Sequence, residues 1–176
     1  TVDLGPPIEV PEIPADANPN NISPEERQFW RSEIKRFKKE RNALVLAHNY
    51  EPEDVQHKEV ADCVGDSLLL ARVGSKSNAD VLVEASVLFM NEILATMKQP
   101  HQIILAPSLE AKCSLAAHAD PAKIQAWKDQ YPNGKIISYV NTYLDVKAER
   151  DYCCASANAA KVILHVLEHS AVTPPI

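Results

Sequence analysis

Short apolar runs rich in β-branched residues alternate along this chain with longer stretches whose apolar residues have helical spacing. Each run has the length of a typical strand, and each is closed by a polar side chain or a turn. Strands that alternate with helices predict a parallel sheet with right-handed crossovers. The expected strands are residues 43–47, 81–83, 103–106 and 136–140, with a short fifth candidate at 152–154.

Helix starts are marked by proline and by side chains that cap backbone N–H groups. Ser23 followed by Pro24 has the N-cap and first-turn proline of a helix. Ser67 and Ser156 have the same N-cap chemistry before later apolar stretches. The later helices are expected at residues 67–76, 89–97, 121–130 and 158–169. The predicted fold class is therefore α/β, with a parallel sheet and flanking helices in three αβα layers.

Prolines and short polar residues fill the first 23 residues, so this segment is expected to be an extended tail. Residues 24–117 contain the first three strands and are expected to form a first α/β domain. Residues 118–176 are expected to begin a second, similar domain.

Composition and charge exclude several classes of protein. With 176 residues and 45% hydrophobic content, the chain can bury a real core, and its net charge of −6 argues against a general nucleic-acid or membrane surface. No apolar run approaches the roughly 18 residues of a membrane span, and no signal peptide is seen, so a cytoplasmic protein is expected. Four cysteines in a chain of this length indicate metal binding, catalysis or simple burial rather than a disulfide framework.

Polar side chains stand at or just after the expected strands. His48 and Glu84 each close an apolar run, Tyr139 and Asn141 close another, and Cys113 follows a third through a turn. Ligands in parallel α/β folds bind outside the carboxyl ends of the strands, so His48, Cys113, Tyr139 and Asn141 can converge on one site. For His48 a structural strand cap is an equally good reading, and Cys113 alone is more often a free thiol than a ligand.

Two helix starts offer anion sites. The segment Gly65-Asp66-Ser67 and the region of Ser156 each place backbone N–H groups and a hydroxyl at a helix N-terminus, although an ordinary N-cap explains both. Cys153 and Cys154 are expected to be packing residues on the two faces of a strand.

Six motifs occur together in one order: AHNY, GDSL, FMNE, LEAKCSL, YVNT and VKAERDYCCASANA. Over about residues 25–170, this set resembles quinolinate synthase, the iron–sulfur enzyme of bacterial NAD biosynthesis. The resemblance implies three similar α/β domains, each giving one cysteine to a central [4Fe–4S] cluster with one open iron. Cys113 corresponds to the first of these ligands.

The resemblance also implies the chemistry. Iminosuccinate and dihydroxyacetone phosphate are joined to give quinolinate, in functional coupling to L-aspartate oxidase, and Tyr50 takes part in proton transfer together with His48. The residues expected to bind iminosuccinate are His48, Ser67, Tyr139, Asn141 and Ser156.

Some positions depart from the family pattern. Leu88 replaces a more polar residue, and Ala157 removes one hydroxyl beside Ser156. The resemblance implies that this is an N-terminal portion whose two other cluster cysteines lie outside it, so the isolated chain is expected to be inactive. Two alternatives are a noncatalytic α/β dicarboxylate-binding or interaction domain that lost the cluster, and a thiol enzyme using Cys113 without iron.

Overall fold

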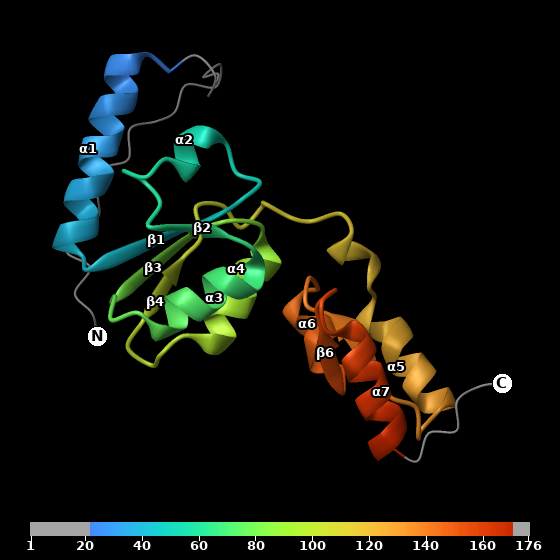
Figure 1. Cartoon of the computed structure of the whole chain (residues 1–176). Coiled ribbons are helices and arrows are strands. Elements are labelled where there is room, and N and C mark those ends of the chain that lie inside the picture. Colours follow the sequence, from blue (N-terminus) through green and yellow to red (C-terminus); the bar gives the residue numbers. More distant parts are fainter. Residues whose placement is uncertain (1–21, 171–176) are drawn as a thin grey trace. The chain divides into compact units, whose positions relative to one another are not determined.

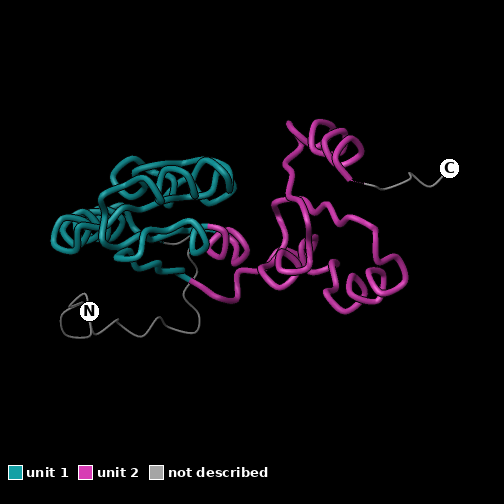
Figure 2. The backbone as a smooth tube through the Cα atoms, turned by 90° about the horizontal axis from the view of Figure 1, so that it is seen from below, with its two compact units in different colours: residues 1–86, 94–107 teal, residues 87–93, 108–176 magenta. Residues whose placement is uncertain are grey.

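The computed structural model describes residues 22–170 and divides the chain into two compact units. Unit 1 comprises Thr1–Ser86 and Leu94–Pro107, and unit 2 comprises Val87–Ile93 and Ser108–Ile176 (Figure 2). The expected tail lies outside the described residues except for its last two positions.

Unit 1 is built on a four-stranded parallel sheet with the strand order β2-β1-β3-β4 (Figure 1). In its register His48 pairs with Gly65. Because all four strands run the same way, their carboxyl ends lie at one edge of the sheet. The strands are β1 Ala43–His48, β2 Cys63–Gly65, β3 Val81–Ala85 and β4 Ile103–Leu105.

Helices flank this sheet, which confirms the expected α/β fold. Helix α1 begins after Ser23, whose hydroxyl accepts a hydrogen bond from the Glu26 N–H at 3.1 Å, and it packs on β1. Helix α3 packs on β1 and β2. The helices in this part of the chain are α1 Pro24–Glu40, α2 Glu53–Gln56, α3 Ser67–Lys76 and α4 Leu88–Met97, the last of which is shared between the units.

The core of unit 1 is closely packed where α3 meets the sheet. Leu46, Leu70, Leu82 and Leu94 are all fully buried. Gly74 of α3 lies so close to them that a Cβ atom at this position would come within 2.8 Å of a methyl group of Leu94. Glycine at this position therefore permits the close approach of α3 to the core.

Glu84 does not lie where the sequence predicted. It lies inside β3 rather than beyond its end, and its side chain is fully buried. The strand is longer than its apolar run because β1 continues to pair with it through Ala85.

Unit 2 has its own sheet of two parallel strands, β5 and β6, in which Tyr139 pairs with Cys154. The short helix α6 connects them, and Val146 of this helix is buried. Neither α6 nor the strand β2 was expected from the sequence. The elements are η2 Ala116–His118, α5 Pro121–Gln130, β5 Ile137–Tyr139, α6 Leu144–Ala148, β6 Tyr152–Cys154 and α7 Ala159–His169.

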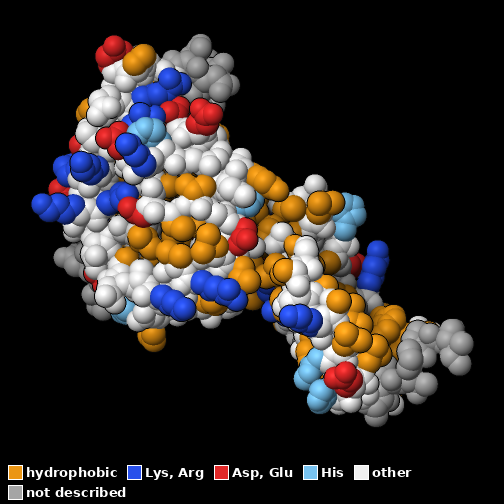
Figure 3. Space-filling view, in the orientation of Figure 1, with side chains coloured by type: hydrophobic (Ala, Val, Ile, Leu, Met, Phe, Trp, Pro, Cys, Tyr) orange, Lys and Arg blue, Asp and Glu red, His pale blue; other side chains and the backbone are white. Residues whose placement is uncertain are grey.

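Helix α7 of unit 2 is only partly covered. Val166 is buried, whereas Ile163, Leu164 and Leu167 are 44–57% exposed. Figure 3 shows hydrophobic side chains on the surface of this unit. No helix among residues 22–170 is long and apolar enough to cross a membrane.

Candidate active site

His48 is the last residue of β1, at the carboxyl edge of the unit 1 sheet. Burial lowers the pKa of its imidazole, and the nearby carboxylates of Glu51 and Asp66 offset this shift only in part. The His48 carbonyl accepts a hydrogen bond from the Glu51 N–H at 3.0 Å, which fixes the turn after the strand. A lowered pKa keeps the imidazole neutral at pH 7, so it can both accept and donate a proton.

Tyr50 stands beside this histidine. The two ring centroids are 4.5 Å apart in an edge-on arrangement, and the Tyr50 side chain is 86% exposed. The AHNY motif therefore places an imidazole and an accessible phenol next to each other.

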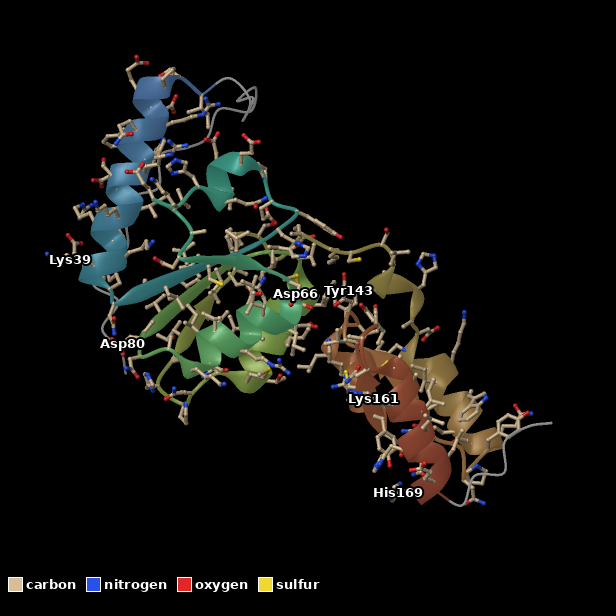
Figure 4. All side chains as sticks on the ribbon, viewed as in Figure 1. Lys39, Asp66, Asp80, Tyr143, Lys161 and His169 are labelled. Carbon is tan, nitrogen blue, oxygen red and sulfur yellow. The ribbon has the colours of Figure 1, made fainter. Side chains whose placement is uncertain are left out.

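The start of α3 lies at the same edge because β2 pairs with β1. The N-cap is Asp66, whose carboxylate accepts a hydrogen bond from the Leu69 N–H at 2.8 Å (Figure 4). Ser67 is the first helical residue and is buried. The expectation that Ser67 is the N-cap is wrong, because the neighbouring carboxylate takes that place.

Cys113 lies in unit 2, in the irregular segment between β4 and η2. Its N–H donates to the Tyr143 hydroxyl at 3.0 Å, and its carbonyl accepts a hydrogen bond from the Ala117 N–H at 3.1 Å. The half-buried thiol is not in a disulfide. Both backbone groups of Cys113 are thus fixed, while its thiol remains as a donor for a soft metal.

Tyr139 and Ser156 meet at the carboxyl edge of the second sheet. Their hydroxyl oxygens are 3.0 Å apart, and Tyr139 is 43% exposed. Ser156 does not cap α7, contrary to expectation. The N-cap is Asn158, whose side-chain oxygen accepts a hydrogen bond from the Ala155 N–H at 2.7 Å.

Asn141 is exposed in the turn between β5 and α6. It follows a strand of the second sheet, whereas His48 ends a strand of the first. The expected single sheet edge shared by His48, Cys113 and Asn141 is therefore wrong. His48 ends β1, Asn141 lies two residues past β5, and Cys113 lies in the irregular segment after β4.

The described residues supply one candidate iron ligand. Among residues 22–170, no three His, Cys, Asp or Glu side chains come together as a metal site. Cys153 and Cys154 are half-buried in β6, in keeping with packing roles. The thiol of Cys113 has the donor chemistry of an iron–sulfur ligand, and the described residues do not bring two further ligands of this kind to it.

Sequence reasoning missed the residues that support the Cys113 segment. Glu92 accepts a hydrogen bond from the Leu144 N–H at 2.8 Å, and the Lys147 ammonium donates to the Thr142 carbonyl. Burial, followed by the charge of Arg150, lowers the pKa of Lys147 to about 8. Glu92 lies in the FMNE motif, Lys147 lies in VKAERDYCCASANA, and Tyr143 directly follows YVNT. The bonds of Glu92 to Leu144 and of Tyr143 to Cys113 join segments far apart in the chain, so they leave no local pattern.

Comparison with known proteins gives one consistent result. The family model described as Quinolinate synthetase A protein matches residues 32–174. The quinolinate synthase of Caulobacter vibrioides is 44% identical over 165 residues, which cover 87% of this chain and 44% of the relative. That of Thermus thermophilus is 48% identical over 131 residues, covering 74% of this chain and 41% of the relative.

A third relative, the quinolinate synthase of Mycobacterium tuberculosis, is 44% identical over 137 residues, covering 78% of this chain and 38% of the relative. The chain thus spans about two fifths of the length of these curated relatives. The family model covers most of this chain, and the matched range contains all the candidate site residues. The chain belongs to the quinolinate synthetase A family.

Proposed function

We propose that this chain is part of a cytoplasmic quinolinate synthase, which condenses iminosuccinate with dihydroxyacetone phosphate in de novo NAD biosynthesis. The match of residues 32–174 to the family model is the observation that carries this proposal. An oxidase acting on L-aspartate, such as L-aspartate oxidase, would supply the iminosuccinate.

In unit 1 we assign proton transfer to His48 and Tyr50. The neutral imidazole of His48 suits a group that takes a proton during dehydration, and the adjacent exposed phenol can accept or donate one. The start of α3 beside His48 suits a substrate carboxylate, because helix N-termini present N–H groups and a positive dipole end. Ser67 is the hydroxyl that we assign to this carboxylate.

In unit 2 we assign substrate binding to Tyr139, Asn141 and Ser156. In the hydrogen bond between Tyr139 and Ser156 one hydroxyl donates and the other accepts, so the accepting hydroxyl can donate its own proton to an anionic oxygen of the substrate. The exposed amide of Asn141 offers both a donor and an acceptor.

Cys113 is proposed as the ligand that this chain contributes to a [4Fe–4S] cluster. When bound, such a cluster supplies an open iron that acts as a Lewis acid toward carboxylate and hydroxyl oxygens. The contribution of this chain is to hold the Cys113 backbone through two hydrogen bonds, so that the thiolate is presented from a fixed segment.

The test is an anaerobic assay of quinolinate formation by a full-length enzyme that contains this sequence. His48→Ala should lower turnover by roughly 100-fold or more, which is the usual contribution of a general acid or base, while cluster absorption is retained. His101→Ala, which removes an exposed histidine of unit 1, is the matched control. Equal turnover in the His48 and His101 variants, or loss of the cluster from His48→Ala, would contradict the role assigned to His48.

A further inference from the structure

The segment around Cys113 is held mainly through its backbone. Ala111, two residues before Cys113, accepts a hydrogen bond from the Leu88 N–H at 2.7 Å. The Cys113 carbonyl is bonded within the following turn, to Ala117. The Cys113 N–H is satisfied by a side chain distant in sequence, the hydroxyl of Tyr143. One phenol thus fixes the direction of the backbone at the residue that carries the thiol.

Tyr143 is itself braced. Its ring meets that of Phe89 edge-on, with centroids 6.4 Å apart, and its carbonyl accepts a hydrogen bond from the Lys147 N–H at 3.0 Å. The N-terminus of α6, which begins at the next residue, is bonded to the Glu92 carboxylate at 2.8 Å. The Lys147 ammonium lies 5.8 Å from the centre of the Phe89 ring. The Tyr143 ring thus rests against Phe89 of α4, and its backbone is fixed at the start of α6 (Figure 4 labels Tyr143).

We propose that Tyr143 is a positioning residue for Cys113, and that its hydroxyl sets the orientation in which the thiolate is presented to iron. This inference rests on the proposed function, in which Cys113 is a cluster ligand. A phenol suits this task because its oxygen is carried on a rigid ring and can accept an N–H bond without adding a negative charge beside the thiolate.

Tyr143→Phe isolates the hydroxyl, because the ring and its contact with Phe89 remain. In a full-length enzyme containing this sequence, the Cys113 amide should exchange its hydrogen roughly threefold to tenfold faster than in the wild type, the range expected for loss of one hydrogen bond. Tyr131→Phe removes a phenol hydroxyl from the exposed end of α5 and is the matched control. If the hydrogen-exchange rate of the Cys113 amide were unchanged in Tyr143→Phe, the Tyr143 hydroxyl would not be holding that amide, and the proposal would be refuted.

The second measurement is the rate at which a ferrous-iron chelator removes iron from the anaerobically reconstituted enzyme, at a temperature well below its unfolding midpoint. We expect Tyr143→Phe to lose iron faster than wild type and to give an altered Mössbauer spectrum, while its midpoint of thermal unfolding stays close to that of wild type. The Tyr131→Phe control should match wild type in all three measurements. A merely structural role would lower the unfolding midpoint and leave iron release unchanged. That result would overturn the positioning role.

A third variant, Cys113→Ser, separates failure of this inference from failure of the proposed function. If Cys113→Ser loses the cluster while Tyr143→Phe releases iron at the wild-type rate, Cys113 is a ligand and the role of Tyr143 is refuted. If Cys113→Ser keeps a complete cluster, the ligand assignment itself is wrong and the inference about Tyr143 falls with it.

Discussion

Glu84 should make the stability of this chain fall as the pH rises from about 4.5 toward neutrality. Its carboxyl group is fully buried in β3, and neither of its oxygens has a hydrogen-bond partner of normal geometry. Burial raises its pKa from 4.5 to about 7, and the nearby Ser86 hydroxyl counteracts this only in part. No charged group of the described residues contributes to the shift.

The sign follows from proton binding. Below a pH of about 4.5 the carboxyl group is protonated in both the folded and the unfolded chain, so its ionisation costs nothing. As the pH rises toward 7, the unfolded chain loses this proton while the folded chain keeps it, and the free energy of unfolding decreases. A shift of about 2.5 pKa units corresponds to about 3 kcal/mol, of which about 2.5 kcal/mol should be lost between about pH 5 and pH 8.

The variant Glu84→Gln removes the ionisation and keeps the shape. Urea unfolding followed by circular dichroism should show that wild type loses about 2.5 kcal/mol relative to Glu84→Gln between about pH 5 and pH 8. Because the change in unfolding free energy between the two pH values is compared, any effect of the buried amide that does not depend on pH cancels. Glu110→Gln is the control, since the Glu110 side chain is 88% exposed. Parallel pH profiles for wild type and Glu84→Gln would refute the reasoning, because they would mean that the folded protein stabilises the ionised carboxylate as well as water does.

Further expectations concern packing and substrate binding. Gly74→Ala should destabilise the chain by about 1–3 kcal/mol in the same urea assay, because the new methyl group meets Leu94 and Leu46 in a filled core, whereas Ser75→Ala on the same helix should change stability little. Asp66→Ala should cost about 0.5–2 kcal/mol by removing the N-cap of α3, while Ser67→Ala should leave the cap intact and weaken dicarboxylate binding to a full-length enzyme, measured by calorimetry. Ser156→Ala should also weaken that binding without loss of a helix cap, and unchanged affinity in both serine variants would leave them without a substrate role.

Strands and long helices were predictable because burial of both sheet faces leaves an apolar run that a sequence displays directly. Helix α5 was found with its observed ends because Asp120 and Pro121 mark its start by local chemistry. Strand β2 was missed because it has three residues, one of them glycine, and owes its conformation to pairing with β1. Helix α6 was missed because its N-terminus is bonded to Glu92, which lies far away in the chain.

The residues of the candidate site also divide into those that local sequence could place and those that depend on the tertiary fold. His48 could be placed at a sheet edge because it closes the apolar run of β1. The sequence did not distinguish Asp66 from Ser67 as the cap of α3, because both side chains can accept a hydrogen bond from an N–H and they are adjacent. Tyr143 could not be connected with Cys113, because a hydrogen bond between residues 30 positions apart depends on the tertiary fold.

The assignment of Cys113 to iron is the central chemical claim, and Mössbauer spectroscopy of a full-length enzyme containing this sequence tests it most directly. After anaerobic reconstitution, wild type and a Cys63→Ser control should each show a stoichiometric cubane cluster and form quinolinate. Cys113→Ser should lose most of both, because a serine oxygen is a poor substitute for a soft thiolate ligand. The 176-residue chain alone should hold no stable cluster, because one thiolate cannot retain it. A complete cluster with turnover in Cys113→Ser would contradict the account.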